Sequence, residues 1–157
     1  MNKEPITLDG HERLKQEIHR LKTQERSRII KAIAEARAHG DLKENAEYHA
    51  AREEQGMLEA RISHLENTLA MAHVIDLKAI KSNTIAFGAT VSLLDLNTDQ
   101  KKKYQIVGKF ESDIKIGKIP IASPIARALI GKKEGEQVTI QVPKGLQEYE
   151  ILKVEFI

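Results

Sequence analysis

A long helical repeat in the first half of the chain limits its fold more than any other feature. Residues 11–75 contain no proline. In the later part of this stretch the apolar residues are spaced by alternating steps of four and three, at Leu58, Ile62, Leu65, Leu69 and Ala72. This spacing is typical of the buried seam between two packed helices. The pattern therefore predicts long helices that pack along one apolar face.

The earlier part of the stretch carries the same seam with one interruption. Its apolar positions are Leu14, Ile18, Leu21, Ile29, Ile33 and Ala36. Two successive steps of four separate Leu21 from Ile29, and Glu25 lies between them. Such a stutter relaxes supercoiling locally. We expect a helix over residues 11–39, about 43 Å long at about 1.5 Å per residue.

The break between the two helices falls at Gly40. It follows the basic residues Arg37 and His39, and glycine tolerates the left-handed conformation that ends many helices. We expect the second helix to begin within residues 41–45. A short link makes long helices antiparallel. This arrangement places Gly56 opposite Ile29, where the absent side chain would admit the isoleucine.

The second half of the chain has a different period. Alternating β-type runs occupy residues 89–94, 104–107, 138–142 and 149–154, with turns at 97–100 and 144–145. Residues 123–131 predict one short helix, with Ser123 as its N-cap, Pro124 in its first turn and Gly131 just past its end. The sequence therefore predicts a small α+β domain after a boundary near residues 76–82.

Composition excludes several classes of protein. The absence of cysteine excludes a disulfide scaffold, a zinc site with cysteine ligands and a thiol nucleophile. Residues 1–6 show no signal peptide, and no apolar run reaches the roughly 18 residues of a membrane span. Residues 1–75 carry 12 Lys and Arg against 13 Asp and Glu, and the remainder carries 13 against 10. Neither half has the basic excess of a duplex-binding domain. We expect a cytoplasmic protein.

Asp41 and Glu44 stand three residues apart where the hairpin turns, and two interpretations stay open. In the first, they form a capping box at the start of the second helix. In the second, they are oxygen ligands for Mg²⁺, which typically takes one or two carboxylates together with waters and substrate phosphate. Two carboxylates alone would hold the ion poorly, so a partner would have to supply the other ligands.

Other side chains near the turn also allow two interpretations. Arg37, Lys43 and Arg52 could form an ordinary solvated helix face, or could guide a single-stranded nucleic acid backbone. Tyr48 could pack beneath the turn or stack on a base.

Three segments resemble the GreA-type family of transcript-cleavage factors. They are Gly40–Glu53, Phe87–Val91 and Ser123–Gly131, and the resemblance extends over essentially the whole chain. It implies an α+β protein with an antiparallel coiled-coil hairpin over residues 1–76 and an FKBP-like domain over residues 77–157. It further implies that the globular domain docks on bacterial RNA polymerase while the hairpin enters the polymerase's secondary channel.

The resemblance also implies roles for particular residues. Asp41 and Glu44 would help to hold the second Mg²⁺ of the polymerase active centre, and the isolated protein would not bind the ion tightly. Tyr48, Arg37 and Arg52 would position the 3′ end of the backtracked RNA. The candidates for polymerase docking are Ser123, Pro124, Ile125, Ala126 and Arg127. The protein would act as a monomer and stimulate the RNA cleavage of the polymerase rather than be an enzyme itself.

Three alternatives predict different features. A channel-binding inhibitor of the same architecture would need an altered turn, and Asp41 with Glu44 argues against it. A coiled-coil dimer would need apolar residues on the outer hairpin face, where the residues are charged. An FKBP-type isomerase or chaperone would need an apolar pocket lined by aromatic rings. The rings available in the second half are Phe87, Tyr104, Phe110, Tyr149 and Phe156.

Overall fold

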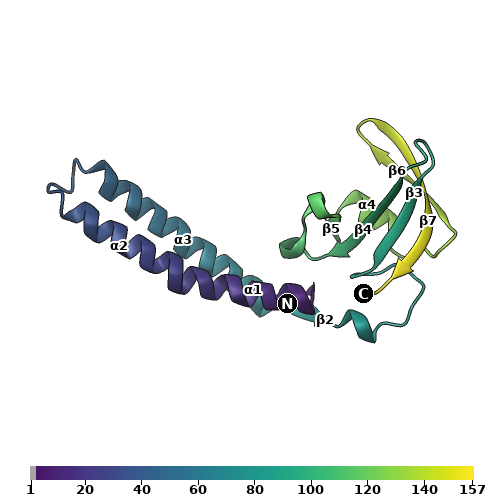
Figure 1. Cartoon of the computed structure of the whole chain (residues 1–157), viewed down its shortest axis with the longest axis horizontal. Coiled ribbons are helices and arrows are strands. Elements are labelled where there is room, and N and C mark those ends of the chain that lie inside the picture. The colour runs from purple at the N-terminus through teal and green to yellow at the C-terminus, as the bar shows by residue number, and fades with distance from the viewer. Residues whose placement is uncertain (1–2) are drawn as a thin grey trace. The chain divides into compact units, whose positions relative to one another are not determined.

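The computed structural model describes residues 3–157, which form two compact units. The first unit holds residues 11–72 and is a helical hairpin. The second holds residues 3–10 together with 73–157 and is built on a β-sheet (Figure 1). The chain is therefore α+β, as the sequence predicts. Residues 3–10 group with the globular unit, although the predicted boundary assigns them to the hairpin.

The hairpin pairs one interrupted helix with one continuous helix. Its outgoing arm is α1 (Leu8–Arg20), the π-helical turn η1 (Leu21–Glu25) and α2 (Arg26–Arg37). Its returning arm is α3 (Ala46–Met71). The buried side chains of the two arms are those of the predicted seam: Leu14, Ile18, Leu21, Ile29, Ile33, Ala36, Leu58, Ile62 and Leu65, joined by Ala51.

The π-helical turn coincides with the stutter. A π turn takes up one extra residue within a helix, so the second step of four does not move the later seam residues to another face. Leu21, the first residue of this turn, and Ile29, in α2 beyond it, are both buried. The sequence located this irregularity but did not predict its π-helical form.

Ion pairs across the hairpin fix which residues face each other. Lys22 Nζ lies 2.7 Å from Glu66, Arg26 lies 2.6 Å from Glu59, and Arg28 also contacts Glu54. These pairings are those of an antiparallel hairpin, as predicted.

The predicted role of Gly56 is wrong. A Cβ atom at this position would meet no atom within 4 Å, and the residue is exposed. Ala51 and Leu58 make the seam contacts in this part of α3, and Gly56 lies off the seam between them. It therefore does not make room for Ile29.

The globular unit contains a five-stranded mixed sheet. Its strands are β3 (Thr90–Asp95), β4 (Lys101–Val107), β5 (Lys118–Pro120), β6 (Gln137–Val142) and β7 (Gly145–Glu155), in the order β5-β4-β3-β7-β6. All neighbours are antiparallel except β4 and β5. The four predicted strands correspond to β3, β4, β6 and β7, while β5 was not predicted.

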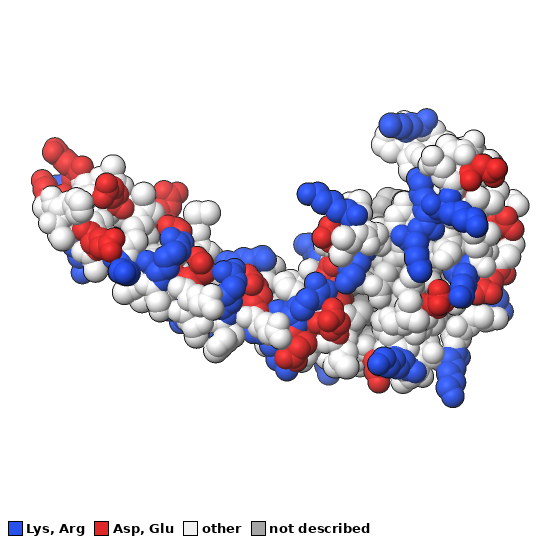
Figure 2. Space-filling model, viewed as in Figure 1, with Lys and Arg blue, Asp and Glu red and all other residues white. Residues whose placement is uncertain are grey.

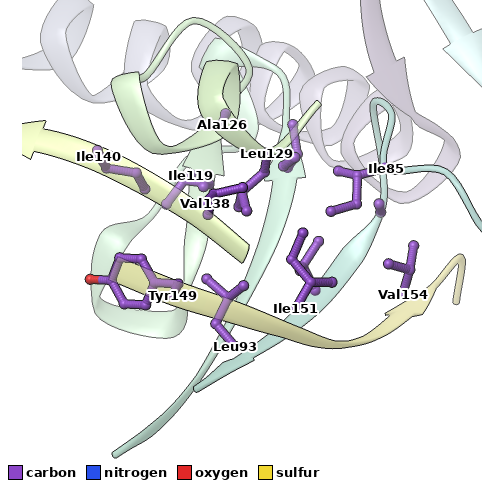
Figure 3. Close-up of a cluster of buried hydrophobic side chains, with 13 residues drawn as sticks. Ile85, Leu93, Ile119, Ala126, Leu129, Val138, Ile140, Tyr149, Ile151 and Val154 are labelled. Carbon is purple, nitrogen blue, oxygen red and sulfur yellow. The ribbon is translucent and has the colours of Figure 1, made fainter. Parts of the chain in front are cut away.

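One face of this sheet carries the core, with α4 (Pro124–Leu129) packed on it (Figure 3). Alternate residues of the strands point toward this helix, as period-two patterns require. The helix has the predicted ends: Ser123 Oγ accepts a hydrogen bond from Ala126 N–H at 3.2 Å, and Gly131 has a φ of +89°. The largest fully buried side chains of this core include Tyr149, Leu129 and Ile151.

A small second sheet and three short 3-10 turns complete the globular unit. The second sheet pairs β1 (Glu4–Thr7) with β2 (Ala72–Ile75). The turns are η2 (Leu77–Ala79), η3 (Lys109–Glu111) and η4 (Ile114–Ile116). None of the helices within residues 3–157 is long and apolar enough to cross a membrane.

Candidate functional site

The hairpin turn, here called the tip, consists of residues 38–45 between α2 and α3. Gly40 has a φ of +115°, the left-handed conformation that its position after Arg37 and His39 predicts. Its outward side is open, because a Cβ atom there would meet nothing within 4 Å. The tip is thus a nonhelical loop, closed by contacts with the two helices.

Asn45 joins the two helix ends. Its Oδ1 accepts a hydrogen bond from Tyr48 N–H at 3.1 Å and so caps α3. Its Nδ2 donates to the carbonyl oxygen of Ala36 at 2.6 Å, at the end of α2. One side chain therefore satisfies a free N–H at the start of one helix and adds a side-chain hydrogen bond to a carbonyl at the end of the other, which also accepts from His39 N–H at 3.2 Å. The prediction that the second helix begins within residues 41–45 is wrong, because Asn45 is the N-cap, residues 41–45 are not helical and α3 starts at Ala46.

The two predicted acids do not form a capping box. Asp41 Oδ1 accepts a hydrogen bond from the N–H of Lys43 at 2.9 Å, within the loop itself. Within the part of the chain that the structure describes, the carboxylate of Glu44 has no hydrogen bond and no ion pair. Both side chains are exposed. One oxygen of Asp41 and the whole carboxylate of Glu44 are consequently free to bind a cation.

An open hollow of about 410 Å³ gathers the acids of the tip. It is lined by His39, Asp41, Glu44, Asn45, Ala46 and Glu47. The structure thus brings the predicted pair together and adds Glu47, which the sequence analysis missed. The signal for Glu47 was its place in the first turn after the Asn45 cap, three residues beyond Glu44. Figure 2 shows acidic side chains gathered at the turning end of the hairpin.

The tip acids offer an incomplete set of metal ligands. Among residues 3–157, no three His, Asp or Glu side chains lie close enough together to hold an ion. The donors present are exposed carboxylate oxygens, which suit Mg²⁺ better than a softer metal. The arrangement can contribute one or two oxygens to an ion whose other ligands belong to a partner.

Tyr48 packs directly behind the tip. Its ring is half-buried, and the guanidinium carbon of Arg37 lies 5.8 Å from the ring centroid. The ring of His49 lies 5.6 Å from it at an angle of 60°, and His49 Nε2 is 3.0 Å from the carbonyl oxygen of Lys43. The structure thus brings Arg37 and Tyr48 together, while Arg52 is exposed one turn farther along α3.

The five docking candidates divide by exposure. Pro124 and Arg127 are exposed at the start of α4, and Ser123 and Ile125 are half-buried. Ala126 has an exposed fraction of 0% and lies in the core beneath the helix. Among the five candidates, Ala126 is thus the one whose side chain faces the core and not the surface.

Comparison with known proteins gives consistent results along the whole chain. A family model described as "Transcription elongation factor, N-terminal" matches residues 4–74, and one described as "Transcription elongation factor, GreA/GreB, C-term" matches residues 80–156. The transcription elongation factor GreA of Xylella fastidiosa (strain 9a5c) is 57% identical over 98% of each chain. That of Bartonella tribocorum is 57% identical over the full length of both.

Solved structures include the GreA factor homolog 1 (Gfh1) protein of Thermus thermophilus. It is 27% identical over 98% of this chain and 99% of that one, with a TM-score of 0.45.

Proposed function

Because this chain belongs to the GreA/GreB family of transcription elongation factors, we propose that its tip brings carboxylate ligands to the active centre of RNA polymerase. The chain is a GreA-type factor that stimulates transcript cleavage by RNA polymerase. Hydrolysis is the polymerase's own reaction, and the chain is not itself the catalyst.

The observation that carries this proposal is the free state of the tip acids. Asp41 and Glu44 border one hollow, and neither carboxylate is occupied by helix capping. Mg²⁺ bound there would activate a water molecule for attack on a phosphodiester bond. Asp41 would offer its unshared oxygen and Glu44 its carboxylate, and the polymerase would supply the remaining ligands. The residues present fit such a shared ion better than an ion held by this chain alone.

The hairpin is the part that reaches the active centre. It consists of two helical arms packed along one seam, so it is a narrow rod. We infer that it enters through the secondary channel of the polymerase and meets the 3′ end of a backtracked transcript there. Lys, Arg, Asp and Glu side chains lie along the visible side of the hairpin among other residues (Figure 2), which supports a monomer. We propose that it acts alongside the polymerase in the cytoplasm.

The candidates for RNA positioning are Arg37, Tyr48 and Arg52, which lie just behind the acids of the tip. The contact of Arg37 with the Tyr48 ring orders the guanidinium beside the tip. Arg52 lies four residues after Tyr48 in α3 and so shares its helix face. We propose that Arg37 and Arg52 bind the phosphates of the extruded RNA and that Tyr48 forms the surface on which this RNA lies.

Docking falls to the globular unit. We propose that residues 77–157 form the FKBP-like docking domain and that the start of α4 contacts the polymerase. Pro124 and Arg127 present exposed surface there, flanked by Ser123 and Ile125.

Cleavage of RNA in stalled, backtracked elongation complexes tests the role of the acids. Asp41→Asn and Glu44→Gln remove a charge without changing side-chain size, so we expect full polymerase binding and loss of stimulated cleavage. Glu53→Gln is the matched control, because Glu53 is an exposed α3 carboxylate beyond the hollow. Wild-type cleavage by either tip variant would refute the metal role.

A further inference from the structure

The globular unit contains a buried carboxylate that the proposed function does not use. Glu111, in η3, has an exposed fraction of only 4%. Its Oε2 accepts hydrogen bonds from the N–H groups of Thr7 at 3.1 Å and of Gly108 at 3.2 Å. Its Oε1 accepts a hydrogen bond from the hydroxyl of Thr7. A buried acid is costly unless donors surround it, and here the donors come from two distant segments of the chain.

Thr7 links this carboxylate to the first helix. It is itself buried, at 6% exposed, and immediately precedes α1. Its Oγ1 accepts a hydrogen bond from Gly10 N–H at 3.0 Å, which caps the helix, while its hydroxyl hydrogen is donated to Glu111. The first turn of α1 is therefore tied to η3 through one hydroxyl group.

Two glycines make room for this arrangement. A Cβ atom at Gly10 would overlap the carboxyl group of Glu111. A Cβ atom at Gly108 would lie 2.7 Å from the carbonyl oxygen of Pro5, closer than such contacts allow. We call the four residues Thr7, Gly10, Gly108 and Glu111 the clasp.

The clasp lies next to the point where the chain passes between its two units. The chain makes this passage twice, between residues 10 and 11 and between residues 72 and 73. The first passage lies inside α1, so the clasped turn and the hairpin arm belong to one continuous helix. The second passage lies in β2, which pairs with β1, the strand that ends at Thr7. Both passages are thus connected to the clasp by regular secondary structure.

We propose that the clasp restrains the direction in which the hairpin leaves the globular unit, which makes Thr7, Gly10 and Glu111 positioning residues for transcript cleavage. A helix transmits the orientation of its first turn along its length, whereas a loop would not. The cleavage part of this inference rests on the proposed function of the tip. The restraint itself can be measured on the free protein.

Pulsed electron paramagnetic resonance measures the restraint directly. The chain has no cysteine, so Lys31→Cys in the hairpin and Thr139→Cys in the globular unit, both exposed, can carry one spin label each. We expect Thr7→Val and Glu111→Gln to broaden or shift the distance distribution between the labels. Thr7→Ser keeps the hydroxyl and should restore the parent distribution.

Asp95→Asn is the matched control. Asp95 is also buried, at 4% exposed, and also accepts two backbone hydrogen bonds, from Asn97 at 2.9 Å and Thr98 at 3.3 Å. It is the last residue of β3 and is not part of the clasp, so the distance distribution should not change. Circular dichroism of each variant establishes whether both units are folded. If a clasp variant does not fold, Gly10→Ala is used in its place.

Cleavage assays then test the consequence. We expect clasp variants to keep the parent's half-saturating concentration, because docking is intact. Their maximal stimulated rate should fall by about tenfold, since a misplacement of about 1 Å can cost up to about 10²-fold. Unchanged distance distributions would overturn the restraint, and full cleavage despite broadened distributions would overturn its functional role. Wild-type cleavage by Asp41→Asn would overturn only the proposed function of the tip.

Discussion

Asn45 combines two capping functions that usually need two residues. It accepts from Tyr48 N–H at the start of α3 and donates to the Ala36 carbonyl at the end of α2. We expect Asn45→Ala to destabilise the hairpin by about 1–2 kcal/mol, the range for the loss of a helix cap. Amide hydrogen exchange at Tyr48 should accelerate accordingly. Asn45→Asp keeps the acceptor and loses the donor, so its effect should be smaller, and equal effects would contradict the double role.

Asp95 makes the stability of the globular unit depend on acid pH. Hydrogen bonding from Asn97 N–H, helped by Thr98 and by Lys102 Nζ at 3.9 Å, lowers the pKa of this carboxyl. A carboxyl whose pKa is lower in the folded state adds stability above its unfolded pKa of about 3.9, and this stability is lost as the pH falls through the folded value.

The variant Asp95→Asn should therefore show a weaker loss of stability below about pH 4 than the parent. Urea unfolding of the globular unit at a series of pH values measures this difference. Parallel pH profiles for parent and variant would show that Asp95 is not the responsible group.

Local chemistry determined which single residues could be predicted from the sequence. Gly40, Ser123 and Gly131 were assigned correctly because each needs only its immediate neighbours to define its conformation. Asn45 was missed because Asp41 is an equally good cap by residue type. The choice between them depends on the Ala36 carbonyl, which lies nine residues away in the sequence.

At the scale of elements, the hairpin shows how far a periodic pattern determines a structure. The seam, the antiparallel pairing and the site of the stutter all followed from apolar spacing. Gly56 did not, because glycine lacks a side chain and its spacing cannot show whether it lies on the seam or beside it.

Gly56 gives a prediction of opposite sign to the sequence interpretation. Because the position is exposed in a helix interior with free space around it, Gly56→Ala should stabilise the hairpin by up to about 1 kcal/mol. Thermal unfolding followed by far-ultraviolet circular dichroism measures the gain. Destabilisation would restore the original view that a larger residue cannot be accommodated there.

Short strands explain most of what was missed in the globular unit. β1 and β2 have four residues each and β5 has three, too few for alternation to be recognised. Their formation depends on pairing with segments far away in the sequence: β1 with β2, and β5 in parallel with β4. The longer strands β3, β6 and β7 carry enough alternating residues to be predicted from local sequence.

At the scale of the whole molecule, activity depends on a partner. The tip offers carboxylates but, within residues 3–157, no group of three ligands for a metal ion. We therefore expect the free protein to leave single-stranded RNA intact in the presence of Mg²⁺, while the same preparation stimulates cleavage in backtracked polymerase complexes. A magnesium-dependent activity that hydrolyses free RNA would contradict a shared site, provided that the activity copurifies with the protein and that Asp41→Asn abolishes it.

The functional regions were predictable only where their residues are close in sequence. The acids of the tip lie within one short segment, and so the sequence alone was enough to propose them as candidates. The clasp was not, because Thr7 and Glu111 lie 104 residues apart. The burial of Ala126 could not be predicted either, because a sequence motif contains buried and exposed residues alike.

The tip separates its framework from its reactive groups. Asn45 and the Ala36 carbonyl close the loop, Asp41 accepts a hydrogen bond from the loop backbone, and Glu44 makes no hydrogen bond or ion pair with another described residue. Substituting the acids therefore leaves the closing contacts of the loop intact. Natural selection can thus change such a protein from an activator of RNA cleavage into one that binds the polymerase without activating it, or that competes with an activator. Two codon changes are enough, and the fold is inherited unaltered.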